Sequence, residues 1–174
     1  SFSRVCEDLA AGKPGGLLIG GGFGAGKSHL MEHLARLAVD AGYTVSRVVI
    51  SKETPIHDPA KVFAAAVESA VMGGYPRPAL IEAAAVLDPD GRAYAELLRW
   101  AASSGSGLNE RFPATLSLFA QVRDSDAAFA DSIVRFWSGA PIPLPELRLR
   151  LKEAGEAKPV LPPVKVRELA VQRI

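Results

Sequence analysis

The sequence predicts an α/β fold whose parallel-sheet core is incomplete in this chain and carries a helical insertion or subdomain. A strand–helix–strand pattern within residues 17–50 is typical of a βαβ unit with a right-handed crossover. After residue 74 strands and helices no longer alternate, and helical patterns dominate up to residue 152. We therefore expect a core over residues 1–74, a helical part over 75–152, and a connector over 153–174 that leads back to the core.

The core is expected to contain two strands and three helices. Residues 3–11 predict a short amphipathic helix, and the three apolar residues 17–19 predict a buried strand. Residues 28–41 keep helical spacing and end before Gly42, a typical C-terminal cap. The β-branched run 44–50 predicts a second, parallel strand. Asp58 and Pro59 then fit the N-cap and first turn of a helix that extends to Met72.

Four helical patterns follow, over residues 78–87, 91–102, 112–121 and 124–137. Large apolar side chains repeat in them at helical spacing, and we expect these to pack as a core rather than to stack on nucleic-acid bases. The expected core residues are Leu97, Leu98, Trp100, Leu116, Leu118, Phe119, Phe129, Ile133, Phe136 and Trp137. Residues 157–163 are proline-rich, and 164–174 predict another amphipathic helix. That helix has no stop signal, which favours a fragment of a longer protein.

Composition narrows the class of protein. The formal net charge is +1, so no global field directs the chain to nucleic acid, although a local patch remains open. Cys6 is the one cysteine, which rules out an internal disulfide and favours a reducing cytoplasm. No apolar run approaches the ~20 residues of a membrane span. We expect a cytoplasmic protein without a membrane anchor.

The glycine-rich stretch between the first strand and the next helix carries the functional signal. Gly21, Gly26, Lys27 and Ser28 fit the phosphate-binding loop, or Walker A pattern, G-x-x-x-x-G-K-[ST]. Glycines permit positive φ angles and leave room for backbone N–H groups to approach phosphates. The following helix adds free N–H groups and the positive end of its dipole. The pattern therefore predicts an incomplete P-loop NTPase core of the AAA+ or RecA-like type.

The motif assigns roles to its residues. Lys27 is expected to contact the β- and γ-phosphates of ATP, and the Ser28 hydroxyl is expected to ligate Mg²⁺. The expected nucleotide-binding residues are Gly21, Gly22, Phe23, Gly24, Ala25, Gly26, Lys27, Ser28 and His29. The alternative is a glycine-rich turn between strand and helix that binds nothing.

A P-loop ATPase also needs an acidic residue that acts on Mg²⁺ and the attacking water. Asp88 follows an apolar run, but the alanines before it and Pro89 after it favour a helix end and a turn. Two alternatives remain: an acidic strand beyond Ile174, which we favour, or Glu53 at the end of the second predicted strand. Lys27 and Glu53 are therefore the catalytic candidates in this chain.

Two further patterns carry weaker signals. His29 and His33 share a helix face at the spacing of two metal ligands, but the glutamate of the H-E-x-x-H motif is absent. We expect His29 to pack beside the nucleotide and His33 to be exposed. Arg148, Arg150 and Lys152 fit a solvated helix face better than a nucleic-acid patch.

Residues 20–30 and 45–58 resemble a family of bacterial AAA+-like ATP-binding proteins of bacteriophage-exclusion (BREX-type) defence systems. The likeness continues through residues 61–63 and 68–70, is weak across the helical region, and returns at Phe136 and Trp137. The resemblance implies an ATPase longer than this chain, with an Asp-Glu strand after a helix like the one at 164–174. That strand is missing here, so hydrolysis by this piece alone is not expected.

The leading hypothesis is thus an ATP-binding module of a P-loop ATPase in a phage-defence system, with a protein partner or a homo-oligomer. The absence of an Asn-Lys-x-Asp motif favours ATP over GTP. A second hypothesis is a nucleotide-dependent scaffold or switch that binds ATP and a protein partner without hydrolysis. A third, a P-loop kinase, lacks support because Arg92, Arg99 and Arg111 are too scattered to predict a lid.

Overall fold

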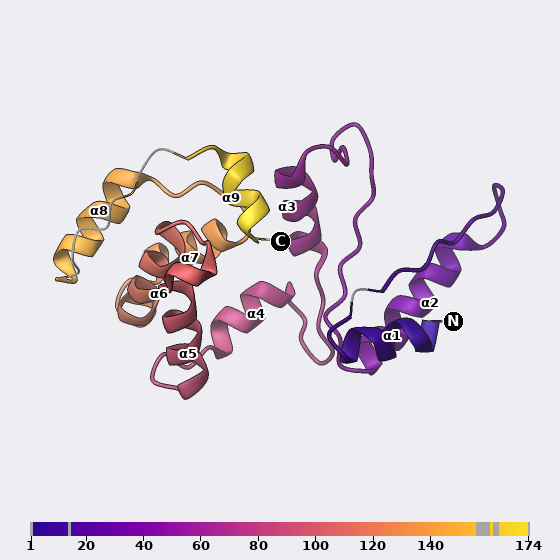
Figure 1. Cartoon of the computed structure of the whole chain (residues 1–174), viewed down its shortest axis with the longest axis horizontal. Helices are drawn as coiled ribbons and strands as arrows, with labels where there is room; N and C mark the ends of the chain where they lie inside the picture. The colour runs from indigo at the N-terminus through magenta and orange to yellow at the C-terminus, as the bar shows by residue number, and fades with distance from the viewer. Residues whose placement is uncertain (1, 14, 156–160, 162–163, 174) are drawn as a thin grey trace.

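The computed structural model describes residues 2–13, 15–155, 161 and 164–173, and this part of the chain is mainly helical (Figure 1). Its helices are α1 (Phe2–Ala10), α2 (Lys27–Asp40), α3 (Pro59–Ser69), α4 (Ala79–Val86), α5 (Arg92–Ala101), α6 (Arg111–Val122), α7 (Ala127–Trp137), α8 (Leu144–Glu153) and α9 (Val166–Arg173), with a 3₁₀ turn η1 (Ser104–Ser106). None of the described helices is long and apolar enough to cross a membrane.

The predicted parallel sheet is wrong for the residues that the structure describes, because they contain no β-strand. One isolated antiparallel bridge joins Val45 and Val71, with N–H···O distances of 3.0 and 2.9 Å. Leu18 is 98% exposed and Val49 is 65% exposed, so neither predicted strand is covered.

Strand formation fails here because a ladder needs a second extended segment about 4.8 Å away. Figure 1 shows the two candidate segments leading in different directions, residues 17–20 toward the start of α2 and residues 44–50 toward the start of α3. β-branched residues favour an extended backbone, but they supply no partner for its N–H and C=O groups.

Helices α1 and α2 begin and end within one residue of the predicted bounds, whereas α3 ends at Ser69 and not at the predicted Met72, because Val71 pairs with Val45 in the bridge. Helix α2 stops at Asp40, and Gly42 follows with a φ of 85°. Its N–H donates to the carbonyl oxygen of Val39 at 2.9 Å, which satisfies one of the last helical acceptors. At α3, Oδ1 of Asp58 accepts from the backbone N–H of Ala60 at 3.1 Å. The capping predictions for Gly42 and Asp58 are confirmed.

The main apolar core lies among α5, α6, α7 and α8. Ile133, Phe136 and Leu147 are fully buried there. Six predicted core residues are buried: Leu116, Leu118, Phe119, Phe129, Ile133 and Phe136. Leu98 and Trp137 are partly buried against them.

Leu97 and Trp100 were predicted wrongly, since they are 37% and 55% exposed. Helical spacing assigns residues to a face but does not say whether another element covers it.

Polar groups inside this core are paired. The indole N–H of Trp137 donates to Oγ1 of Thr115 at 3.0 Å, and the Thr115 hydroxyl donates to the carbonyl of Arg111 at 2.7 Å. The hydroxyl of Tyr94 hydrogen-bonds to the carbonyl of Leu116, and burial raises the pKa of Tyr94 to about 12. Trp137 and Phe119 pack with ring centroids 5.0 Å apart, which supports packing rather than base stacking.

Helix α8 turns most of its charged side chains outward. Arg148 and Lys152 are exposed. Arg150 pairs with Asp126 at 2.5 Å and with Glu153 at 3.5 Å. The expectation of a solvated face fits Arg148 and Lys152, whereas Arg150 joins α8 to the start of α7.

The last helix, α9, packs against α3 and is hydrogen-bonded to the loop before α6. The side-chain oxygen of Gln172 accepts from the backbone N–H of Asn109 at 2.9 Å, and its amide nitrogen donates to the carbonyl of Gly107 at 3.3 Å. The predicted helix over 164–174 is thus present from Val166 to Arg173. The predicted proline-rich connector, residues 157–163, lies outside the described residues apart from Leu161.

Candidate functional site

The glycine-rich loop leads into the first turn of α2 and is exposed along its length. Gly24 and Gly26 have φ angles of 75° and 76°, in the left-handed region that L residues rarely adopt. Gly26 occupies the N-cap position of α2. Phe23, which directly precedes Gly24, is fully exposed. The glycines therefore make the reversal from extended chain to helix that the sequence motif requires.

The first turn of α2 presents backbone donors to solvent. The N–H of Leu30 donates to the carbonyl of Gly26 at 3.0 Å, and no side chain caps the helix. Among the described residues, none accepts a hydrogen bond from the backbone N–H of Lys27, Ser28 or His29. Three free N–H groups and the helix dipole favour an anion at this position.

Lys27 bends back over the loop. Its ammonium group donates to the carbonyl oxygen of Gly21 at 2.8 Å and to that of Gly22 at 2.5 Å. The side chain is half-buried. A positive charge and the free N–H groups of α2 thus belong to the same short loop, which is the arrangement that a phosphate group needs.

The space beside the loop is open at three of its glycines. A Cβ built on Gly22, Gly24 or Gly26 would meet no atom within 4 Å. Gly21 differs, because a Cβ there would lie 3.3 Å from the Cβ of Ala25. Glycine at 21 therefore permits close packing within the loop, and the other three leave room for a ligand to approach the backbone.

Glu53 lies in the loop that precedes α3, and the structure does not bring it to the glycine-rich loop. Figure 1 shows that loop above α3, away from the projecting turn before α2. Ser51 donates a hydrogen bond of 2.7 Å to Oε2 of Glu53. This bond lowers the pKa of the Glu53 carboxyl, with smaller contributions from the residue's own backbone N–H and the charge of Lys61. The carboxylate is thus held within its own turn.

The remaining candidates do not assemble into a metal site. His29 and His33 are both exposed on α2. Asp88 follows α4, where its carboxylate accepts from the backbone N–H of Asp90 at 3.1 Å, so the prediction of a turn at Asp88 is confirmed. Within the described ranges, no three His, Cys, Asp or Glu side chains lie close enough together to hold a metal ion.

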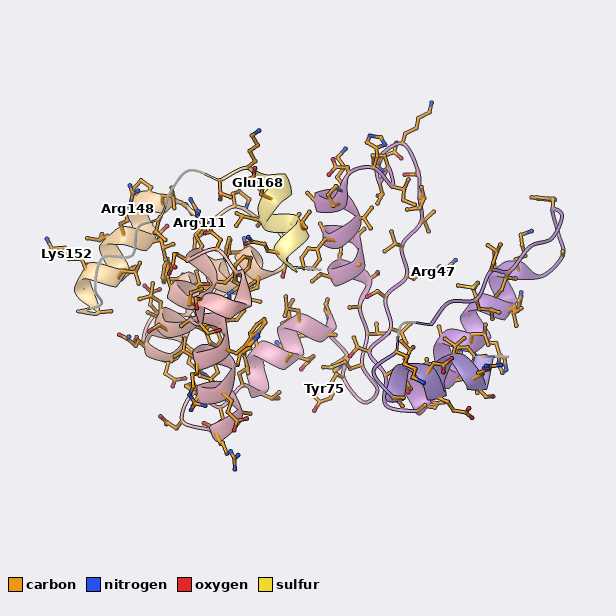
Figure 2. All side chains as sticks on the ribbon, in the orientation of Figure 1. Arg47, Tyr75, Arg111, Arg148, Lys152 and Glu168 are labelled. Carbon is orange, nitrogen blue, oxygen red and sulfur yellow. The ribbon has the colours of Figure 1, made fainter. Side chains whose placement is uncertain are left out.

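Sequence reasoning did not foresee an apolar groove of about 880 Å³ between α3 and helices α4 to α6. Its lining includes Phe63 of α3, Leu80 of α4, Trp100 of α5 and Phe112 of α6. The sequence itself places Val62, Phe63, Ala66 and Val67 at helical spacing after Pro59, which indicates an apolar side of that helix. The elements that face this apolar side cannot be read from the sequence, because the relative placement of α3 and the later helices depends on contacts between distant segments. Figure 2 shows the side chains between these helices.

Comparison with known proteins gives a match for the N-terminal part of the chain. Residues 1–82, a little under half of the chain, match the model of a family described as BREX system ATP-binding protein BrxC/D. A search of curated proteins and a search of solved structures each found no match.

The matched part contains α1, α2, α3, the glycine-rich loop and the first residues of α4. It is similar to ATP-binding proteins of a phage-defence system, and the resemblance inferred from residues 20–70 is confirmed there. Residues 83–174 lie outside the match, including Phe136 and Trp137.

Proposed function

We propose that this chain is the ATP-binding module of a P-loop AAA+-like ATPase of a phage-defence system, and that residues 21–29 bind the phosphates of the nucleotide. The observation that carries the proposal is the start of α2, where free N–H groups, left-handed glycines and the Lys27 ammonium converge. The same loop lies within the residues that match an ATP-binding family. ATP is the nucleotide that the family description supports.

The residues present fit a phosphate group chemically. The backbone N–H groups of Lys27, Ser28 and His29 would donate to its oxygens, and the Lys27 ammonium would exchange two carbonyl partners for a charged one. The negative charge of a phosphate adds an attraction to the ammonium that a neutral carbonyl oxygen does not supply, so the exchange is favourable. The bound phosphate would therefore replace the contacts that Lys27 makes with Gly21 and Gly22.

Mg²⁺ would reach the site together with the nucleotide. The ion keeps several waters and commonly takes only one or two protein ligands beside phosphate oxygens. The exposed hydroxyl of Ser28, at the start of α2, is the protein oxygen of the motif that would hold it. Mg²⁺ bound with ATP helps to neutralise the charge of its phosphates.

A nucleotide-dependent scaffold or switch is the second candidate, and the position of Glu53 favours it. The Glu53 carboxylate is bonded to Ser51 in the loop before α3, away from the glycine-rich loop. Without an acid near the phosphates, the chain would bind ATP and leave the attacking water unactivated. In both proposals the chain binds a protein partner or a second copy of itself. A neighbouring subunit commonly supplies the arginine that completes a P-loop site.

The test is calorimetric titration of the chain with ATP in the presence of Mg²⁺. Lys27→Ala should weaken binding by ~10- to 100-fold, since a charge-assisted contact contributes about 1.5–3 kcal/mol. Lys152→Ala is the matched control, because Lys152 is an exposed lysine on α8 at the far side of the molecule from α2 (Figure 2). Equal affinity in wild type and Lys27→Ala would overturn the assignment of the loop.

A further inference from the structure

We draw no further inference here: the strongest candidate, the apolar groove between α3 and helices α4 to α6, has nothing in the structure to show what covers it.

Discussion

The ammonium nitrogen of Lys27 lies 2.8 Å from the carbonyl oxygen of Gly21, six residues earlier in the chain. This contact closes the glycine-rich loop over the first turn of α2. It keeps the lysine charge beside the backbone donors that a phosphate would use, and a bound phosphate would take the place of the two carbonyl oxygens that now accept from Lys27.

The first prediction concerns the left-handed glycine at the N-cap of α2. Gly26→Ala should weaken ATP binding by about tenfold, because an L residue at a φ of 76° is strained by about 1–2 kcal/mol. The loop would relax and turn its N–H groups away from a common point. Titration calorimetry measures the affinity, and circular dichroism checks that the helices remain.

Gly20→Ala is the control for this change. Gly20 lacks a left-handed φ, and a Cβ there would meet no atom within 4 Å. The affinity of Gly20→Ala for ATP should equal that of wild type. Equal affinities in all three proteins would contradict the view that the conformation of Gly26 shapes the site.

The second prediction is that the chain binds ATP but hydrolyses it at or near the uncatalysed rate. Glu53 is held by Ser51 in another loop, and each missing electrostatic element costs about 10²-fold or more in rate. Single-turnover measurement with radiolabelled ATP gives the rate directly. Glu53→Gln should leave it unchanged. Robust hydrolysis that disappears in Glu53→Gln would show that this acid reaches the nucleotide after all.

The third prediction uses two leucines of α8. Leu147 is fully buried, whereas Leu149 is 54% exposed. Leu147→Ala should lower the free energy of unfolding by about 2–5 kcal/mol, because it removes buried methyl groups and leaves a cavity. Leu149→Ala should change it by less than about 1 kcal/mol. Urea denaturation followed by circular dichroism compares them, and similar losses in both would show that α8 packs differently.

The fourth prediction concerns the pH dependence of stability at Glu82. Two nitrogens of the Arg77 guanidinium donate to its carboxylate, at 2.8 and 3.3 Å. These bonds hold the pKa of Glu82 below its ordinary value of 4.5. A carboxylate with a lowered pKa in the folded protein stabilises the fold above pH 4.5. That stabilisation disappears as the pH falls through the lowered value.

Glu82→Gln should therefore be less stable than wild type at pH 7, and the difference should shrink as the pH falls toward 3. Urea denaturation at pH 7, 5 and 3 measures it. Glu96→Gln is the control, because Glu96 pairs with Arg92 on the surface and such pairs contribute about 0–1 kcal/mol. If the difference in unfolding free energy between wild type and Glu82→Gln does not depend on pH, the ion pair between Arg77 and Glu82 is not its cause.

Local signals in the sequence succeeded where the interaction spans a few residues. The N-cap at Asp58, the glycine after α2, the turn at Asp88 and the free start of α2 all depend on neighbours within about four positions. Helical spacing likewise identified most of the large apolar side chains that are buried on α6 and α7. The backbone geometry of the glycine-rich loop belongs to this group, since its left-handed glycines and the contacts of Lys27 lie within one loop. Phosphate binding by this loop stays a prediction.

Local signals failed where the interaction joins distant segments. The run 44–50 has the β-branched composition of a strand, yet within the described part of the chain only Val45 of this run forms a β-bridge, and its antiparallel partner is Val71. Trp100 has the spacing of a core residue, yet it lies at a groove. Both errors have one cause: composition favours a conformation or a face, whereas a partner segment decides whether it is paired or covered.

The sequence by itself therefore determined the left-handed glycines of the glycine-rich loop, the helices around it and the resemblance to an ATP-binding family. These features depend on short stretches of chain whose backbone geometry is set by glycine, proline and capping side chains. Tertiary structure alone decided that the described chain carries no sheet, that Glu53 lies away from Lys27, and that α9 joins α3 to the later helices. Each of these depends on the meeting of segments far apart in sequence, for which loop closure costs entropy that no local pattern records.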